Sequence, residues 1–323
     1  MEQRRLFGND DIRIVDAMNN LAVAASGLGR HTEAERLYQR ILAIERRVNG
    51  DEHAETLAVM NNITVEYIAE GRYALAEDIA KQTLILKRRV LGDEHPSTLR
   101  TSNQLGVIYR NEGKYEDAET LLSSTLEARQ RVMGPDHVDT INNVNSLALV
   151  YQAEAKYTEA EPLLVQVIES RRRLLGEEHP LVIASMTNLA DLHRRQGKLK
   201  DAETGFAEVL ELRRRVLGPD HPNTLSVLTS LAAVKFDQRD YADAEGFLRA
   251  ALAGYERRNA DNWQRYYAQS LLGATLIKGD RLIEAEHLLT SGYQGLVARQ
   301  SAIPVENQGV LSDARQWLAG IVK

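Results

Sequence analysis

Five histidines recur along this sequence at a constant spacing of 42 residues, and their side chains are of a type that binds metal ions. The series is His53, His95, His137, His179 and His221. Each histidine falls in a different copy of a repeated sequence, and neighbouring helices pack about 8–10 Å apart, whereas the ligands of one zinc ion each lie about 2.0–2.1 Å from it. We therefore predict no metal site and no cofactor. We expect the histidines to cap helices or to fill the joints between them.

Arginines gather at the same regular intervals, and a row of them could bind nucleic acid. The clusters are Arg46-Arg47, Arg88-Arg89, Arg131, Arg171-Arg172-Arg173, Arg213-Arg214-Arg215 and Arg257-Arg258. The whole chain has a formal net charge of −6, whereas nucleic-acid binding normally requires a basic face. Cations near helix C-termini are stabilising by about 0.3–1 kcal/mol each, and their stems can cover apolar surface. We therefore predict a structural role for the arginines and no nucleic-acid partner.

Polar amides form two neighbouring columns with the same spacing. The first column reads Asn19, Asn61, Asn103, Asn145, Thr187, Thr229 and Leu271, and the second reads Asn20, Asn62, Gln104, Ser146, Asn188, Ser230 and Leu272. Asparagine is a mediocre helix former, so four asparagines in register require a cause. An amide offers a donor and an acceptor together, so it can pair with a peptide backbone of any sequence. The alternative is that the asparagines bond to neighbouring repeats or to water.

Motifs for catalysis and for membrane insertion are absent from the sequence. It contains no Gly-x-Ser-x-Gly, no His-Glu-x-x-His, no phosphate loop and no dinucleotide fingerprint. With no cysteine, the chain has no disulfide, thiolate zinc site or cysteine nucleophile. Its first residues lack the apolar core that a signal peptide requires, and no apolar stretch approaches about 20 residues. We predict a cytoplasmic protein that is not an enzyme and has no membrane partner.

The elements that must position these residues follow the same spacing. The recurring glycines are Gly8, Gly50, Gly92, Gly134, Gly176 and Gly218. An Ala-Glu pair keeps this spacing, and self-similarity at such a period indicates a solenoid. In residues 92–133, the apolar periodicity predicts a first helix from Thr98 to a stop at 112–114, and a second helix from Tyr115 to the next glycine. A column of small residues that includes Gly106 indicates that the two helices approach closely.

One repeat carries enough of this pattern to compare with a known family. Its features are Leu105-Gly106, Tyr109, Gly113-Lys114-Tyr115, Ala118-Glu119 and the Leu-Gly-Asp-Glu-His-Pro junction at 91–96. The pattern resembles the tetratricopeptide repeat, in the longer form found in kinesin light chains and many bacterial proteins. The resemblance implies an all-α, right-handed superhelix of about seven helix pairs. It also implies a concave groove lined by the first helices, and an asparagine ladder that contacts bound peptide.

The repeats assign most of the chain to one predicted solenoid, residues 1–303. The repeats lie near 9–50, 51–92, 93–134, 135–176, 177–218, 219–260 and 261–300. Residues 1–8 are interpreted as the remnant of a preceding helix. Residues 304–323 carry apolar residues at helical spacing and are predicted to form a C-terminal capping helix.

These patterns predict a scaffold that binds an extended peptide or a partner helix in its groove. The predicted peptide-binding residues are Asn19, Asn61, Asn62, Asn103, Gln104, Val107, Arg110, Asn145, Asn188 and Arg194. Asparagines hold the central columns with no lysine beside them, which argues against a clamp for a C-terminal carboxylate. An apolar or mildly acidic peptide is the expected ligand.

Two alternatives remain open at this level. The chain could be the regulatory segment of a larger enzyme such as a bacterial serine/threonine kinase, because residues 4–7 resemble the last turn of a helix whose beginning is missing. The tail from Tyr293 to Pro304 also resembles the ends of repeat regions fused to such kinases, although no kinase motif is present. Alternatively, the chain could form a homo-oligomer through an uncapped first helix that carries Ile12, Val15 and Met18.

Overall fold

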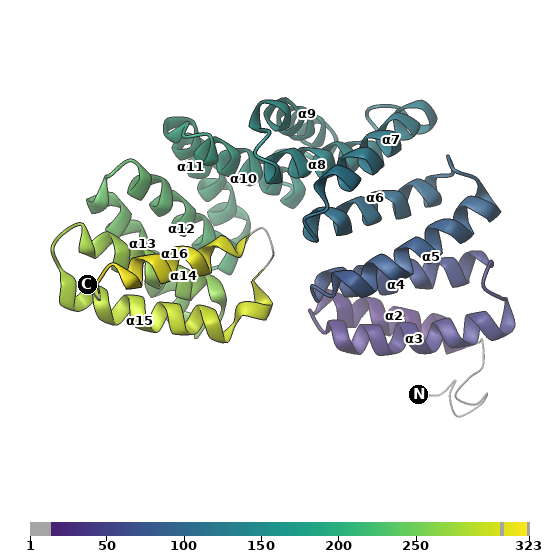
Figure 1. The fold of residues 1–323 in the computed structure, drawn as a ribbon, viewed down its shortest axis with the longest axis horizontal. Helices are drawn as coiled ribbons and strands as arrows, with labels where there is room; N and C mark the ends of the chain where they lie inside the picture. Colours follow the sequence, from purple (N-terminus) through teal and green to yellow (C-terminus); the bar gives the residue numbers. More distant parts are fainter. Residues whose placement is uncertain (1–13, 304–306, 322–323) are drawn as a thin grey trace. The chain divides into compact units, whose positions relative to one another are not determined.

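The computed structural model describes residues 14–303 and 307–321, and within these ranges it consists of helices and turns without strands (Figure 1). The chain divides into two compact units between Glu154 and Ala155. The first unit contains α2 (Val15–Gly27), α3 (His31–Val48), α4 (Ala54–Ala69), α5 (Tyr73–Leu91), α6 (Pro96–Asn111), α7 (Tyr115–Met133) and α8 (Val138–Ala153). Consecutive helices pack in pairs, which confirms the predicted all-α solenoid.

The second unit begins with helices of 19, 16, 19 and 16 residues and ends with α-helices of 11 to 17 residues. It contains α9 (Tyr157–Leu175), α10 (Pro180–Arg195), α11 (Leu199–Leu217), α12 (Pro222–Asp237), α13 (Tyr241–Arg257), α14 (Trp263–Ile277), α15 (Leu282–Ala298), the short 3-10 helix η2 (Gln300–Ala302) and α16 (Gly309–Ala319). The predicted remnant at 1–8 and the boundary at 303/304 fall on or next to residues outside the described ranges. The division of the chain into a solenoid and a separate cap therefore stays a prediction.

The histidine series begins the first helix of five repeats. His95 directly precedes α6 and has an extended backbone conformation. Its Nδ1 accepts a hydrogen bond from the backbone N–H of Ser97 at 3.1 Å. The same bond recurs at the other four histidines of the series. It satisfies one of the backbone donors that a helix start leaves unpaired. The predicted capping role is confirmed.

A close approach of the paired helices explains the column of small residues. Gly106 of α6 is buried, and a Cβ added to it would lie 2.6 Å from Cγ of Leu122 on α7. In the next repeat, Ala148 is fully buried at the same position. Only glycine or another small residue allows two helices to pack at this distance.

Ion pairs between residues 37 apart connect successive repeats. Arginines at the ends of second helices pair with carboxylates in the preceding long turn, as for Arg89 with Glu52, Arg215 with Glu178, and Arg257 with Asp220. These arginines at the helix ends therefore form contacts between repeats. Their partners are turn carboxylates as well as helix dipoles, a pairing that the sequence analysis did not foresee.

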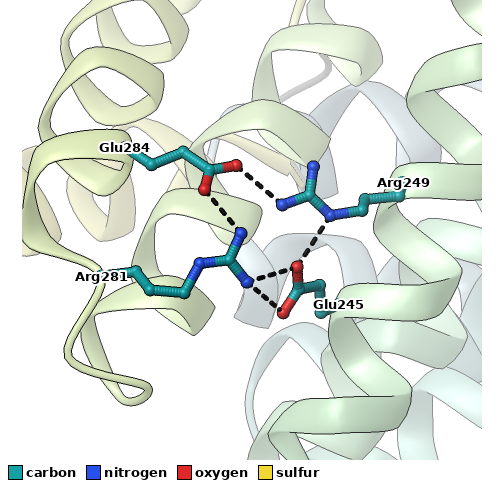
Figure 2. A network of polar contacts seen from close by, with 4 residues as sticks. All are labelled: Glu245, Arg249, Arg281 and Glu284. Carbon is teal, nitrogen blue, oxygen red and sulfur yellow. Dashed lines mark hydrogen bonds and ion pairs between the residues drawn. The ribbon is translucent and has the colours of Figure 1, made fainter.

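The glutamates of the Ala-Glu pairs form a second series of ion pairs between repeats. Glu77 Oε2 lies 2.6 Å from Lys114 Nζ in the turn before α7. Near the C-terminal end, Glu245 and Arg249 of α13 face Arg281 and Glu284 at the start of α15 (Figure 2). Arg281 Nη1 donates to Glu245 at 2.7 Å, and Arg249 Nη2 donates to Glu284 at 2.7 Å. Each carboxylate thus contacts cations from both helices.

The last helix packs against several others. α16 lies against α14 and α15, and the ring of Trp317 stacks with Tyr267 of α14 at 6.3 Å between centroids. The same ring lies 6.1 Å from Phe236 of α12. Phe236 holds the position that Arg194 holds one repeat earlier, 42 residues before it, and that Arg110 holds three repeats earlier. α16 therefore covers part of the predicted groove side of its own unit.

Candidate functional site

The first amide column of the N-terminal unit lies on the first helices of successive repeats. Asn61 is on α4, Asn103 on α6 and Asn145 on α8, and all three are half-buried. Oδ1 of Asn61 accepts a hydrogen bond from the Thr101 hydroxyl at 3.0 Å. This bond joins α4 to α6, so the alternative of bonding between repeats holds at this position.

The other two asparagines keep unused hydrogen-bonding capacity. The Oδ1 atoms of Asn103 and Asn145 are shielded from solvent and have no hydrogen-bond partner in the described part of the chain. Oε1 of Gln104, in the second column, is in the same situation. A buried acceptor left unpaired costs about 1–3 kcal/mol. Because the three residues are only half-buried, a turn of each side chain brings its amide to the surface, where a donor from outside the chain would remove that cost.

Of the remaining predicted residues, four lie in the N-terminal unit and two in the C-terminal unit. Asn19 on α2, Asn62 on α4 and Val107 on α6 are half-buried members of the N-terminal unit. Arg110, also on α6, donates through Nε and Nη2 to Oδ1 of Asn111, at 3.2 and 2.8 Å. The structure thus brings eight of the ten predicted residues into one unit, where they lie on α2, α4, α6 and α8. We name five of them, Asn61, Asn62, Asn103, Gln104 and Asn145, the amide surface.

Asn188 and Arg194 belong to the C-terminal unit. Both lie on α10 and are half-buried. Arg194 Nε donates to Oδ2 of Asp237 at 2.7 Å. Burial opposes its charge, but Tyr267 and Asp237 raise the pKa of Arg194 above its usual value. This guanidinium is therefore committed to an ion pair inside its own unit.

Sequence analysis missed a row of buried cations behind the amide columns. Lys87 of α5 is 2% exposed, and its Nζ donates to the Thr101 hydroxyl at 2.9 Å. Because that hydroxyl also donates to Asn61, the cation is linked to the amide surface through one side chain. Burial, with a contribution from Arg100, lowers the pKa of Lys87 to about 8.

The next repeat has a buried arginine at the same position, which donates to backbone carbonyls instead of a hydroxyl. Arg129 of α7 is 1% exposed and donates through Nη2 to the carbonyl of Leu99 at 3.1 Å. It also donates to the carbonyl of Asp139 at the start of α8. Burial lowers the pKa of Arg129 to about 10; the Asp139 carboxylate opposes this shift and Arg100 adds to it.

The C-terminal unit has two cations at the same repeat position, the buried Arg171 and the half-buried Arg213. Arg171 donates to the Ser185 hydroxyl at 2.6 Å, and Arg213 donates to the Thr187 hydroxyl at 3.3 Å. Thr187 is itself a member of the first amide column. Burial lowers the pKa of both arginines. In both units, then, a cation of a second helix reaches a hydroxyl of a first helix.

A sequence signal for this row existed. Ala118, Leu122, Thr125 and Arg129 are separated by four, three and four residues, which places the arginine on the apolar stripe of its helix. The terminal clusters described above include Arg171 and Arg213 but not Arg129, and they join arginines of the apolar stripe with arginines of the outer surface.

The described residues contain neither a cluster of metal-binding side chains nor a membrane-spanning helix. No group of three or more histidine, aspartate or glutamate side chains in these ranges could hold a metal ion. None of the helices in these ranges combines the length and the apolar composition that crossing a bilayer requires.

Comparison with known proteins identifies the repeat and its structural relatives. The family model described as Tetratricopeptide repeat matches residues 13–88, 67–131, 97–147, 140–204 and 183–257. These matches together span well over half of the chain. No curated protein sequence matches it.

Solved structures with this fold include kinesin light chain-like proteins. One is a putative kinesin light chain from Podosopora anserina with nearly identical TPR-like repeats, at 25% identity and a TM-score of 0.52, covering 65% of this chain and 99% of that one. Another is BtubC (BKLC) from P. vanneervenii, at 17% identity and a TM-score of 0.56, covering 76% and 91%. A Rap protein complexed with Competence and Sporulation Factor matches at 14% identity and a TM-score of 0.65, covering 96% and 88%.

Proposed function

Because this chain belongs to the tetratricopeptide repeat family, whose solenoids are scaffolds for protein–protein interaction, we propose that it binds an extended peptide or a partner helix through its amide surface. The shielded, unpartnered amide oxygens of Asn103 and Asn145 carry this proposal. Two adjacent repeats present them at the same position, and a peptide backbone supplies N–H donors at regular intervals. The proposed role is non-enzymatic.

The charges behind the amide surface favour an acidic ligand. Lys87 and Arg129 are buried and donate to neutral oxygens, and the exposed Arg100 lies one turn before Asn103. Asp139, 3.5 Å from Arg100, is the carboxylate that partly offsets them. Three cations and one carboxylate leave a positive field, which a carboxylate on the ligand would offset. Val107 beside Asn103 offers an apolar contact for the rest of the peptide.

The Rap structure is compatible with this proposal. That protein shares the fold and was solved with Competence and Sporulation Factor bound. At 14% identity the likeness concerns the fold alone. The chemistry of the proposed ligand therefore rests on the residues of this chain.

The test is a triple substitution of Asn61, Asn103 and Asn145 by alanine. A partner is first identified by affinity purification and mass spectrometry, and its binding segment is synthesised as a labelled peptide. Each hydrogen bond lost at Asn103 and Asn145 contributes about 0.5–1.5 kcal/mol, so the triple variant is expected to bind at least about fivefold more weakly.

A double variant, Gln82→Ala with Gln130→Ala, is the matched control. Both glutamines are exposed on second helices, away from the amide surface, and the control should bind the peptide as the parent does. Circular dichroism melting checks that all variants fold. Equal binding by the folded triple variant and the parent would show that the amide surface is not the binding site.

Self-assembly is a second candidate, favoured by apolar exposure on the first described helix. Of the residues predicted to dock, Ile12 lies outside the described ranges and Met18 is buried, whereas Leu21 and Val23 of α2 are 53% and 55% exposed. Association through this helix would bury both side chains. Light scattering over a range of concentrations tests the candidate, and a monomer at every concentration would exclude it.

A further inference from the structure

One column of second-helix side chains is interrupted at a single repeat. The column reads Leu37, Ile79, Leu121, Leu163, Gly205, Phe247 and Leu288. Six members are half-buried large apolar residues, whereas Gly205 has no side chain. At this place α9, α10 and α11 line a cavity of about 360 Å³ that is open to solvent on one side. Ligand-binding pockets in proteins typically measure about 300–1,000 Å³.

The floor of this cavity is apolar. Ile168 of α9 is 6% exposed, and Met186 and Ala190 of α10 are 5% and 1% exposed. Leu189 adds a partly buried side chain. Water in such a space finds few hydrogen-bond partners, so an apolar group of matching size is a better occupant.

The rim of the cavity carries carboxylates that are not paired. Glu169, Asp201 and Glu208 line it and are exposed. None of the three forms a hydrogen bond or an ion pair with another described residue. This contrasts with the carboxylates that connect successive repeats, such as Glu77 and Glu245.

The two basic residues of the rim already have carboxylate partners. Arg172 Nη2 lies 2.8 Å from Glu177, and His193 Nε2 lies 3.2 Å from Glu161. The mouth of the cavity is therefore negative, and the unpaired carboxylates can accept cations from outside the chain.

We propose that this cavity binds a segment of a partner protein in which one large apolar side chain is flanked by lysine or arginine. The apolar side chain fills the space that leucine, isoleucine or phenylalanine fills in the other repeats. The flanking cations face Glu169, Asp201 and Glu208. A buried apolar anchor with charged surroundings is the usual composition of a strong contact in a protein interface.

The cavity is separate from the amide columns. Met186, Ala190 and His193 share one face of α10, whereas Asn188 lies two residues from Met186 and thus about 200° around the helix. The inference therefore does not rest on the proposed peptide binding. Substitution of the amide surface should leave binding in this cavity unchanged.

Three synthetic peptides test the proposal directly, with Met186 as the reporter. Acetylated and amidated Lys-Lys-Phe-Lys is titrated into the full chain carrying ¹³C-methyl methionine, and the Met186 methyl resonance should shift saturably. The buried Met18 and Met60 should not respond. Lys-Lys-Ala-Lys lacks the anchor and Glu-Glu-Phe-Glu has the wrong charge, so neither should saturate the Met186 shift.

Variants of the cavity and its rim complete the test. Gly205→Leu should abolish the shift by filling the cavity, whereas Gly246→Leu, at a helix position with open space around it, should not. A Cβ at position 205 would lie 3.0 Å from that of Ala190, so thermal unfolding must show that Gly205→Leu is folded. Glu169→Gln and Glu208→Gln keep the shape of the cavity and should each weaken binding about two- to fivefold.

Three results would overturn the proposal. They are the absence of a saturable shift with Lys-Lys-Phe-Lys, an unchanged affinity of folded Gly205→Leu, and equal affinity for the acidic and basic peptides. If the chain alone associates with rising concentration and Gly205→Leu abolishes that association, the cavity belongs to a contact between copies, and the foreign partner is rejected.

Discussion

Replacing Lys87 by methionine should stabilise this protein at neutral pH, although it removes hydrogen bonds. The lysine is 2% exposed, and burial lowers the pKa of its ammonium from 10.5 to about 8. One pKa unit corresponds to about 1.4 kcal/mol, so the lowered pKa corresponds to a destabilisation of the folded state by about 3 kcal/mol. Loss of the bond from Nζ to Thr101 offsets about 1 kcal/mol. The expected net gain at pH 7 is about 2 kcal/mol.

The sign of the pH dependence follows from which state binds more protons. Between pH 8 and pH 10.5 the unfolded chain keeps the Lys87 proton while the folded chain loses it. The free energy of unfolding of the parent therefore rises with pH through this window. Below pH 8 the cost of the buried charge is fully present, and the Lys87→Met variant has no such cost at any pH.

Urea unfolding, followed by circular dichroism at pH 7, 8, 9 and 10, measures this difference between parent and variant. The advantage of Lys87→Met should shrink as pH rises and should vanish or reverse near pH 10. Lys200→Met, at an exposed position of α11, is the matched control and should change stability by less than about 0.5 kcal/mol. A constant difference between parent and variant, or an NMR titration of Lys87 near 10.5, would refute the argument.

Two further predictions concern the caps and the helix contacts. Burial, together with Arg258 and Arg213, lowers the pKa of His221. The stabilising contribution of this cap is therefore complete above pH 6.5 and is lost as pH falls below that value. Thermal unfolding from pH 5 to 8 should show this dependence, and His221→Ala should remove it and cost about 1 kcal/mol at pH 8. Gly106→Ala should destabilise the protein by about 1–3 kcal/mol because the new Cβ meets Leu122. Gly246→Ala has open space around it and should stabilise the protein slightly. Urea unfolding midpoints compare the two variants, and equal midpoints would contradict the close helix contact.

Much of the fold could be predicted from the sequence because its signals are local. The caps at His95 and its equivalents involve an atom two residues away, and the start of α7 at Tyr115 follows the turn at Gly113. The 42-residue period then repeats these local rules along the chain. The amide columns were visible for the same reason, since one position in each repeat occupies one position on each first helix.

The bonding of those amides could not be predicted from the columns. Asn61 and Asn103 hold equivalent positions, yet Asn61 is bonded to Thr101 and Asn103 has an unpartnered oxygen. The difference arises because residue 101 is a threonine, whereas its counterpart near Asn103 is Asn143, whose side chain bonds to the carbonyl of Leu122. Which neighbour comes within hydrogen-bond distance depends on how the helices pack.

The sequence by itself determined the helix pairs, their caps and the period that stacks them, because those depend on residues within a few positions of each other. Only the tertiary structure decided that Lys87 and Arg129 are buried, that Arg194 pairs with Asp237, and that the missing side chain of Gly205 leaves a cavity. These features join residues from ten to more than forty positions apart. They depend on the spacing between helices and on the volume of facing side chains, which the period alone does not specify.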